Sequence, residues 1–401
     1  MGQDAEHDGE HPLRIALVGP AEPRAFAQYF DPVTRAQLPT GLGGVPVNEL
    51  GRALVDAGHH VVLITSSRDI EQPMSFSGAG LHIEVHPYRS RARDRALDFF
   101  RRERAGVAAA LGAHEVDVIH AHWTYEYAWG ALGTGTPLVV TAHDSPFTIL
   151  RWQPNIYRLI RLVMAWRVRL SVRHLTAVSP YLARRWRSTM LFRREIAVVP
   201  NIAPFEPAVP AATASHSLAV VDVTDASRLK NVTTLIAAFA LVRQEAPDAT
   251  LTLIGGGLGV DGGLAHWATA RGIEVGIRFL GPASRVVVAE ELKAADVLAH
   301  TSREESQGII LLEAMAHNLA IIGGRTSGGV PWTLGDGAAG ALVDVSSPRS
   351  VADAIVAFNG RVPSQDPHAY AARTLLETRF SVDAVRDAYV ATYRRAIAAG
   401  G

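Results

Sequence analysis

Two glutamates eight positions apart give the strongest chemical signal in the sequence, since Glu305 follows a predicted strand and Glu313 lies inside the next predicted helix. Ligands of open α/β sheets bind at the carboxyl ends of strands, and a helix that starts there offers free N–H groups and a partial positive charge. We therefore expect a diphosphate at Gly308 and Ile309, where this helix begins. Glu313 would then accept hydrogen bonds from ribose hydroxyls, and Glu305 would reach hydroxyls of an attached sugar. The alternative is a surface glutamate before an amphipathic helix.

A lysine follows the first predicted strand of the same half of the chain. Lys230 ends the segment Ser227-Arg-Leu-Lys, so its cation faces the same edge of the sheet, and lysine is a common phosphate ligand. Only two of the 39 basic residues are lysines, the other being Lys293, which favours a specific role for Lys230. Arg228 is a second candidate cation on this turn. The alternative is a solvated charge at the start of a helix.

Histidines end two predicted strands of the N-terminal half. His120 and His122 close one strand and His143 follows another, so all three are expected at the edge where ligands bind. We expect His143 to contact the ligand and the other two to pack or to support it. The His-x-His pattern also suits a metal, but no third ligand is evident and no Asp-x-Asp triplet occurs. We therefore predict neither a metal nor another cofactor.

Two glycine patterns precede predicted helices. Gly43-Gly44 allows close approach of the backbone to a ligand, although a plain turn explains it equally well. Gly257-Leu-Gly-Val-Asp-Gly262 matches the dinucleotide-binding pattern, but it follows the second strand of its series rather than the first. No acidic residue ends a strand about 20 residues later, as that pattern requires. We therefore interpret this loop as one that passes close to a ligand.

The composition narrows the class of protein. At roughly 150 residues per domain, a chain of 401 residues suggests two domains, and an apolar share of 48% suffices for large cores. The net charge of zero excludes an electrostatic nucleic-acid binder. The lack of cysteine excludes disulfides and thiol catalysis and suits a cytoplasmic protein. No apolar run approaches the roughly 20 residues of a membrane span.

Predicted strands and helices alternate in two series, which indicates α/β domains with mostly parallel sheets. The first series occupies residues 1–204 and the second occupies residues 218–379. Prolines and a run of small residues predict a linker over residues 205–217. A helix predicted over residues 380–401 is expected to pack back on the first domain. The expected architecture is two Rossmann-like domains that face each other across a cleft.

In their order along the chain, these motifs resemble the family 4 retaining glycosyltransferases, which have the GT-B fold. The resemblance covers nearly all of the chain, and the glutamate pair in its context is the most specific part. The other matching segments are Gly43-Gly44, Ala57-Gly-His-His-Val61, Asp117-Val-Ile-His-Ala-His122, Val140-Thr-Ala-His-Asp144, Ala177-Val-Ser179, Val199-Pro-Asn201, Lys230-Asn231, Leu253-Ile-Gly255 and Ser327-Gly-Gly-Val-Pro331.

The resemblance implies roles for four residues. Glu313 would bind the donor ribose, and Glu305 would contact the donor sugar. Lys230 would hold the diphosphate, and His143 would touch the transferred sugar. Four positions depart from the family pattern and leave the choice of donor open: Asp225 in place of arginine, Gln307 in place of phenylalanine, Trp332 in place of glutamate and Ile202 in place of glycine.

We therefore predict a retaining glycosyltransferase that moves a hexose-type sugar from a nucleoside-diphosphate sugar to a sugar, lipid or small-molecule acceptor. The donor would bind in the C-terminal domain, with Gly43 and Gly44 approaching it from the N-terminal side, and the acceptor would bind in the N-terminal domain. The rival hypotheses are a nucleotide-sugar epimerase of similar fold and a catalytically inactive sugar-nucleotide-binding protein.

An arginine-rich stretch suggests contact with an anionic membrane surface. Residues 151–194 hold eleven arginines, no acidic residue and interleaved tryptophans. Arg158, Arg161, Arg169 and Arg173 fall within an arc of about 120° on a helix. Basic residues near such a surface contribute on the order of 1 kcal/mol each, and tryptophan favours the interface. This predicts a peripheral protein on the inner face of the cell membrane that acts on a lipid or a lipid-linked glycan; the alternative is a solvated arginine face.

Overall fold

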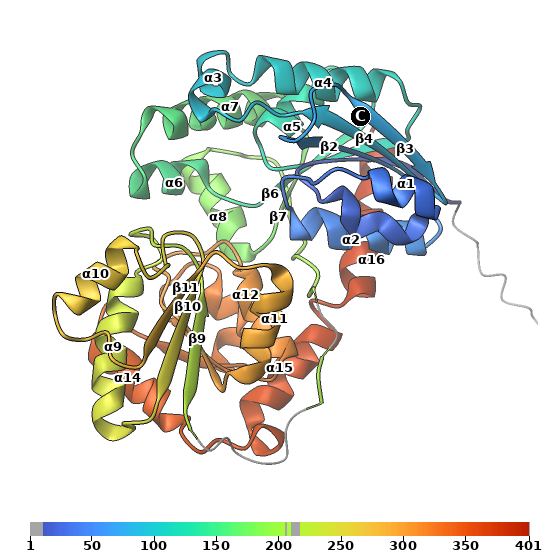
Figure 1. The fold of residues 1–401 in the computed structure, drawn as a ribbon. Coiled ribbons are helices and arrows are strands. Elements are labelled where there is room, and N and C mark those ends of the chain that lie inside the picture. The colour runs from blue at the N-terminus through green and yellow to red at the C-terminus, as the bar shows by residue number, and fades with distance from the viewer. Residues whose placement is uncertain (1–10, 205–206, 210–216, 401) are drawn as a thin grey trace, which may run out of the picture. The chain divides into compact units, whose positions relative to one another are not determined.

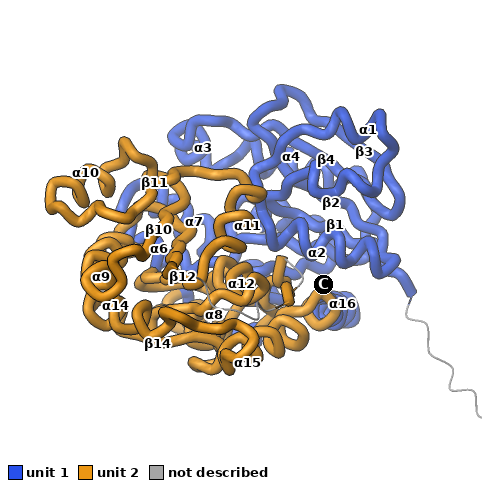
Figure 2. The backbone as a smooth tube through the Cα atoms, turned by 60° about the horizontal axis from the view of Figure 1, so that its bottom comes forward, with its two compact units in different colours: residues 1–176, 190–197, 386–401 blue, residues 177–189, 198–385 orange. Residues whose placement is uncertain are grey.

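The computed structural model describes residues 11–204, 207–209 and 217–400, which divide into two compact units. Unit 1 comprises residues 1–176, 190–197 and 386–401, and unit 2 comprises residues 177–189 and 198–385 (Figure 2). Most of the predicted linker lies outside the described residues. The helix expected at the end of the chain is α16 (Val382–Ala398), which belongs to unit 1 from Arg386 onward. The domain limits drawn from the sequence stay a prediction.

Unit 1 is built on an eight-stranded sheet in the order β3-β4-β2-β1-β5-β6-β7-β8. Strand β1 pairs in parallel with β2 and β5, whereas β3 runs antiparallel to β4 at one edge. The strands are β1 (Arg14–Val18), β2 (His60–Ser67), β3 (Met74–Gly78), β4 (Leu81–Pro87), β5 (Val118–His122), β6 (Leu138–Ala142), β7 (His174–Ala177) and β8 (Ile196–Val198). The sequence pattern does not predict β3 or β8, because each is short and buries a single side chain.

Helices flank this sheet (Figure 1). Gly44 adopts a left-handed conformation with φ of 93° at the start of α2, and Pro46 lies in the first turn, where its missing N–H costs nothing. The helices of this part of the chain are η1 (Pro23–Tyr29), α1 (Pro32–Gln37), α2 (Val45–Asp56), α3 (Ala92–Leu97), α4 (Arg101–Gly112), α5 (Glu126–Gly130), α6 (Pro146–Trp152) and α7 (Ile156–Ser171).

Unit 2 is built on a six-stranded sheet in the order β11-β10-β9-β12-β13-β14, in which every pair is parallel. Its strands are β9 (Ala219–Val223), β10 (Thr250–Ile254), β11 (Ile277–Gly281), β12 (Val297–His300), β13 (Ala320–Gly324) and β14 (Ala341–Val343). Parallel strands buried on both faces form continuous apolar runs, which is why the sequence predicts all six. The predicted α/β class with two largely parallel sheets is confirmed.

Two hydrophobic cores lie on the two faces of the unit 2 sheet. One core contains α9 and α14, and the other contains α11, α12 and α15 (Figure 1). The helices are α8 (Pro180–Thr189), α9 (Val232–Glu245), α10 (Gly263–Thr269), α11 (Arg285–Ala294), α12 (Ile309–Ala316), α13 (Val330–Thr333), η2 (Gly335–Gly337), α14 (Pro348–Ala357), η3 (Pro363–Gln365) and α15 (Pro367–Glu377). Within the described residues of either unit, no helix is long and apolar enough to span a membrane.

Candidate functional site

A half-buried charge pair joins Lys230 to Glu305 in unit 2. Lys230 lies on the turn after β9, and Glu305 lies on the loop after β12, the strand beside β9 in the sheet. Their side chains form an ion pair and are only 21% and 14% exposed. The structure thus brings together two predicted site residues, at the carboxyl edge of the sheet where ligands of α/β folds bind.

Asn231 fixes the Lys230 turn to neighbouring strands. Its backbone is left-handed, with φ of 57°, at the start of α9. Its side-chain amide donates to the carbonyl oxygens of Thr301 at 3.2 Å and Val345 at 2.7 Å, which follow β12 and β14. Two hydrogen bonds to strand ends therefore hold this turn in place beside the ion pair.

The ion pair continues into the core through His300, which the sequence analysis does not single out. The Nε2 atom of His300 lies 3.0 Å from Oε1 of Glu305, and its Nδ1 atom lies 3.0 Å from Oδ1 of Asp222. Asp222 is fully buried inside β9. A carboxylate within the apolar run Ala-Val-Val-Asp-Val is the signal that could reveal this chain of residues, because buried charges are almost always partnered.

These groups carry alternating charges at neutral pH. Burial works to lower the pKa of His300, but hydrogen bonds with Asp222 and Glu305 prevail and raise its pKa to about 9. Burial works to raise the pKa of Glu305, but Lys230 and His300 hold that pKa well below its usual range. Glu305 is therefore an ionised carboxylate between two cations, and it can only accept hydrogen bonds.

The helix α12 begins directly beyond this loop. Gly308 is left-handed, with φ of 85°, at the N-terminus of the helix, and Ile309 is its first residue. The N-terminus of a helix favours an anion because its first N–H groups lack helical partners. Gly308 and Ile309 therefore lie where the sequence analysis expects a diphosphate.

The turn Ser327-Gly-Gly packs against the loop that carries Glu305. The N–H of Gly329 donates to the carbonyl oxygen of Glu305 at 2.8 Å. A Cβ atom on Gly328 would lie 2.5 Å from that same oxygen, and one on Gly329 would lie 2.2 Å from the carbonyl oxygen of Ser306. Only glycine fits both positions, so this segment positions the Glu305 backbone.

Glu313 lies on α12, one turn beyond its start, and is 13% exposed. The guanidinium of Arg285, from the first residue of α11, lies 3.9 Å from its carboxylate. The sequence analysis does not identify Arg285, because no strand end or motif marks it. Its position adds a second cation close to a predicted donor-binding carboxylate.

Three of the four departures from the family pattern, Gln307, Trp332 and Asp225, make local contacts. The side-chain oxygen of Gln307 accepts from the backbone and side-chain amides of Asn201, at 2.9 Å and 2.8 Å. Trp332 packs edge-on against Phe380, with ring centroids 5.7 Å apart. Asp225 accepts from a backbone amide in its own turn, and Arg228 is exposed on that turn.

Unit 1 contains a pocket of about 470 Å³ at the carboxyl edge of its sheet. Its lining includes residues that directly follow β2, β4 and β5, and Pro20 just beyond β1, which places it where α/β sheets bind ligands. No local sequence pattern predicts this pocket, because its arginines and aromatic side chains come from distant segments. The lining residues are Pro20, Gly41, Leu42, Arg68, Asp69, Tyr88, Arg95, Trp123, Glu126, Tyr127, Tyr157 and Arg161.

Several buried polar atoms of this lining have no hydrogen-bond partner within the described residues: Nε of Arg95, Oε2 of Glu126, the hydroxyl of Tyr127 and Nε of Arg161. Glu126 accepts from the Tyr88 hydroxyl at 3.0 Å through its other oxygen. The guanidinium of Arg161 lies 3.7 Å from the ring centroid of Tyr125 and 3.9 Å from Glu126. Buried polar atoms without partners are costly, so the pocket is suited to a polar ligand.

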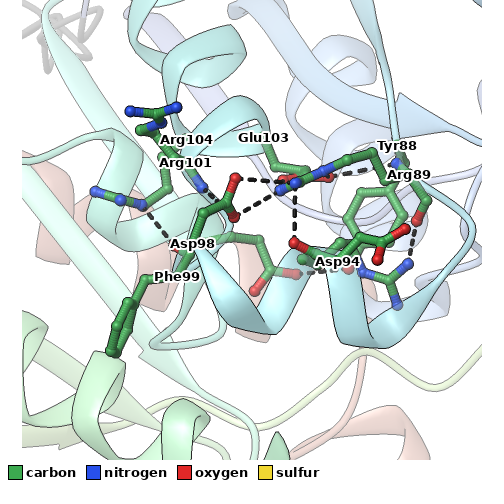
Figure 3. Close-up of polar contacts among 10 residues, drawn as sticks. Tyr88, Arg89, Asp94, Asp98, Phe99, Arg101, Glu103 and Arg104 are labelled. Carbon is green, nitrogen blue, oxygen red and sulfur yellow. Dashed lines mark hydrogen bonds and ion pairs between the residues drawn. The ribbon is translucent and has the colours of Figure 1, made fainter.

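A network around Arg89 supports one wall of the pocket (Figure 3). Its guanidinium donates to both oxygens of Asp98, at 2.8 and 2.9 Å, and to both oxygens of Glu103, at 2.6 and 2.9 Å. Its carbonyl oxygen accepts from Arg95, whose guanidinium lies over the Tyr88 ring at 4.5 Å. Bidentate pairs of this kind fix orientation, so Arg89 holds Tyr88 and Arg95 in place.

His143 follows β6 and belongs to a stack of rings in unit 1. Its Nε2 atom lies 2.8 Å from Nδ1 of His122, and its ring stacks on Trp123 with centroids 4.2 Å apart. Burial lowers the pKa of His143 to about 3, so the ring is neutral at physiological pH. Trp123 also lines the pocket, and therefore connects His143 to it.

The other two candidate features of unit 1 lie near this edge. His120 is fully buried, and its two ring nitrogens lie 2.7 Å from the hydroxyls of Tyr393 and Thr141. Gly43 and Gly44 are both left-handed, and a Cβ atom on Gly44 would lie 1.8 Å from the carbonyl oxygen of Pro20. Close packing against the end of β1 therefore explains Gly44, while the space around Gly43 is open.

Only part of the predicted arginine face is exposed. Arg173 lies beyond the end of α7 and is exposed, whereas Arg158 and Arg169 are half-buried. Arg161 points into unit 1, where it lines the pocket and its side chain is only 16% exposed. Arg169 donates to the carbonyl oxygens of Met190 and Leu191. The exposed row of the helix is instead mainly apolar, and consists of Ile156, Leu159, Val163, Arg167 and Leu170.

Two α/β units with wholly or largely parallel sheets, each with polar groups at the carboxyl edge of its sheet, are the architecture of GT-B glycosyltransferases. Residues 43–204 match the family described as Glycosyltransferase Family 4, and residues 215–359 match the family described as Glycosyl transferases group 1. The chain belongs to the family 4 retaining glycosyltransferases, which use nucleotide sugars.

Known proteins agree with this assignment. The N-acetyl-alpha-D-glucosaminyl L-malate synthase of Bacillus anthracis is 26% identical over 332 residues, or 78% of this chain and 83% of that protein. The D-inositol 3-phosphate glycosyltransferase of Mycobacterium leprae is 36% identical over 158 residues, but the match covers only 38% of this chain and 36% of that protein. A sucrose-phosphate synthase structure from Thermosynechococcus elongatus shares the fold with a TM-score of 0.76 at 19% identity, covering 96% of this chain and all of that one.

Proposed function

We propose that the enzyme transfers a hexose-type sugar from a nucleoside-diphosphate sugar, bound in unit 2, to an acceptor bound in the pocket of unit 1. The observation that carries the donor assignment is the half-buried Lys230–Glu305 ion pair at the carboxyl edge of the sheet, beside the start of α12. A cation, a helix N-terminus and two carboxylates at one edge match the parts of a sugar nucleotide: a diphosphate and two sets of hydroxyls.

Each candidate donor residue has one proposed role. Lys230, with Gly308 and Ile309 at the start of α12, holds the diphosphate, and Glu313 accepts the ribose hydroxyls. Glu305 accepts hydrogen bonds from hydroxyls of the transferred sugar and is kept ionised by Lys230 and His300. When the bond to the sugar breaks, negative charge develops on the diphosphate, and Lys230 and the helix dipole stabilise it without a metal.

The remaining candidates have less direct roles. Arg228 is exposed close to Lys230 in sequence, and we assign it to the outer phosphate. In unit 1, His143 offers a neutral ring that we assign to the transferred sugar, and Gly43 and Gly44 give the backbone room to approach the donor. These assignments extend the family resemblance residue by residue.

The acceptor is proposed to be a hydroxyl compound that carries a phosphate or a carboxylate. The pocket has three arginines against two acidic residues, and Arg161 and Arg95 keep buried N–H groups without partners in the described residues. Arginine binds both anions with matched geometry. The relatives named above support this chemistry, because malate and inositol 3-phosphate are both anionic.

Product analysis tests this function. The purified enzyme, a panel of uridine, guanosine and adenosine diphosphate sugars, and anionic and neutral polyols should give nucleoside diphosphate release that requires both substrates. Conversion of the donor to its epimer without any acceptor would support the epimerase hypothesis. Donor binding with neither transfer nor hydrolysis across the panel would support an inactive binding protein.

A second observation favours an acceptor presented at a membrane. Tyr157 and Arg161 of α7 line the pocket, whereas Ile156, Leu159 and Leu170 of the same helix are 70%, 45% and 65% exposed. Exposed apolar side chains along one helix face suit the interfacial region of a bilayer. We therefore retain the proposal of a peripheral protein on the inner face of the cell membrane, with apolar contacts from α7 in place of the predicted arginine face.

Vesicle binding decides this point. Wild type should sediment with anionic vesicles more than with neutral ones, and the double substitution Ile156→Gln and Leu170→Gln should abolish this. The matched control is the single substitution Arg151→Gln, at an exposed arginine before α7, which should reduce binding only slightly. Absence of wild-type binding to either vesicle would assign the pocket to a free anionic acceptor.

A further inference from the structure

Two histidines and a glutamate converge at one point of unit 1. His82 and Glu84 are alternate residues of β4, so both project from the same face of the strand. His114 follows the end of α4 and reaches the same face. The Nε2 atoms of His82 and His114 lie 2.9 Å and 3.1 Å from Oε1 of Glu84, and one ligand atom from each residue lies within 4.8 Å of the others.

These separations are those of atoms that share a metal ion. With metal–ligand bonds of about 2.0–2.1 Å, neighbouring ligand atoms lie roughly 2.9 Å apart at octahedral angles and about 3.3 Å apart at tetrahedral angles. Two imidazoles and one carboxylate form a common ligand set for zinc and for other divalent transition metals. We propose that His82, Glu84 and His114 bind one divalent transition metal ion, for which Zn²⁺ is the probe.

The surroundings of the cluster suit this role. The Oγ atom of Ser77 lies 2.9 Å from Nδ1 of His82 and can accept its proton, which leaves the Nε2 lone pair for the ion. The Oγ atom of Ser75 lies 3.0 Å from the same Nε2 atom and is an additional oxygen beside the site. The three ligand side chains are 25%, 16% and 22% exposed, so water can occupy the remaining coordination positions.

Without an ion, the same cluster is a hydrogen-bonded network. The Nε2 atoms of both imidazoles lie within hydrogen-bonding distance of the same oxygen of Glu84. The two imidazoles then donate N–H groups to one carboxylate oxygen, and a metal ion would replace both protons. A test must separate this proton-only network from a metal site.

The position of the cluster indicates what the ion would do. His82 is the second residue of β4, so the cluster lies toward the amino-terminal end of a strand whose carboxyl end contributes Tyr88 to the pocket. Glu84 and His114 are 30 residues apart in the sequence, and the ion would join β4 to the end of α4. Metal binding that requires a folded site stabilises the fold. We therefore expect the ion to stabilise unit 1 without taking part in sugar transfer.

Direct binding measurements test the proposal. The full-length chain, without a histidine tag and stripped with a chelator, is titrated with Zn²⁺ by calorimetry and with Co²⁺ by visible absorption. The variants are Glu84→Gln and His114→Ala. The matched control is His60→Ala, which removes an exposed histidine that lines the same surface hollow as His82 and His114.

Wild type and His60→Ala should each bind one Zn²⁺ per chain and show Co²⁺ absorption bands. Glu84→Gln and His114→Ala should bind at least about 10-fold more weakly. Free Zn²⁺ at 100 times its Kd should raise the Tm of wild type by about 5–10 °C but leave that of the two variants unchanged. No saturable binding to wild type would overturn the proposal, whatever the folding of the variants. Equal binding to wild type and to well-folded Glu84→Gln would overturn it as well.

Discussion

The ammonium group of Lys230 and the carboxylate of Glu305 form an ion pair at the carboxyl edge of the unit 2 sheet, and His300 holds the same carboxylate oxygen from the core side. Each buried charge therefore has a partner before a ligand arrives, which avoids the cost of an isolated buried charge. A diphosphate would give Lys230 a second anionic partner. His300 would still hold one carboxylate oxygen of Glu305, and the carboxylate could accept hydrogen bonds from sugar hydroxyls.

Glu305→Gln should lower kcat and should also lower the free energy of unfolding, because Lys230 and His300 lose their shared anionic partner. The amide keeps the shape of the side chain but loses the charge that partners Lys230 and His300, and such charge-assisted bonds are worth about 1.5–3 kcal/mol each. We expect a loss of roughly 10- to 150-fold in steady-state assays. Glu304→Gln is the matched control, because the neighbouring Glu304 contacts Tyr181 instead. Equal activity of Glu305→Gln and wild type would remove Glu305 from the site.

Glu313→Gln should weaken donor binding through the ribose alone. Its expected effect is a rise in donor Kd of about 10-fold or more, because a carboxylate accepts hydroxyl bonds more strongly than an amide does. A donor analogue whose ribose lacks both hydroxyls should bind wild type and variant equally. Glu290→Gln, at an exposed position of α11, is the control. An equal penalty for both donors would place Glu313 elsewhere in the mechanism.

Because of His300, the free energy of unfolding of unit 2 should fall at alkaline pH. Its pKa is about 9 in the folded chain and near 6.5 in an unfolded one. Because the pKa is raised on folding, protonated His300 adds up to about 3 kcal/mol to the free energy of unfolding. This contribution is fully present below pH 6.5 and is lost as the pH rises through 9. Urea unfolding at intervals between pH 6 and pH 10 should show this loss in wild type but not in His300→Gln. Parallel curves for the two proteins would contradict it.

The sequence predicts the parts of the fold that repeat in a regular way. All six strands of unit 2 are apolar runs between helices, and the glutamate pair follows one of them, so Lys230 and Glu305 can be placed at one edge from pattern alone. By contrast, His300 and Asp222 appear only as single polar residues at or inside strands. Their contact depends on the order of β9 and β12 in the sheet, which strand patterns do not specify.

The pocket of unit 1 could not be predicted from the sequence, for a different reason. Its side chains come from eight or more segments, and no local spacing relates Arg68 to Arg161. The periodicity of α7 groups Arg158, Arg161 and Arg169 on one side and Arg167 on the other, but it does not tell which side faces solvent. One apolar row of α7 is exposed while Arg161 is inside, because Glu126 and Tyr125 offer Arg161 partners.

Arg161→Met should raise the KM for an anionic acceptor by about 10-fold or more and leave donor binding unchanged. Methionine fills the volume of the side chain but cannot bind a phosphate or a carboxylate. Arg167→Met is the matched control, because Arg167 lies on the exposed row of the same helix. Kinetics with anionic and neutral acceptors would separate the effects. A loss that is the same for both acceptors would indicate a structural role for Arg161.

Calorimetric titration of the nucleotide-sugar donor into wild type, Lys230→Met and Lys293→Met tests the central claim most directly. The two substitutions remove the only two lysines of the chain, one paired with Glu305 and one exposed on α11. The account predicts that Lys230→Met raises the Kd of the donor by roughly 10- to 150-fold and that Lys293→Met leaves it unchanged. The same Kd for all three folded proteins would contradict a donor diphosphate at Lys230.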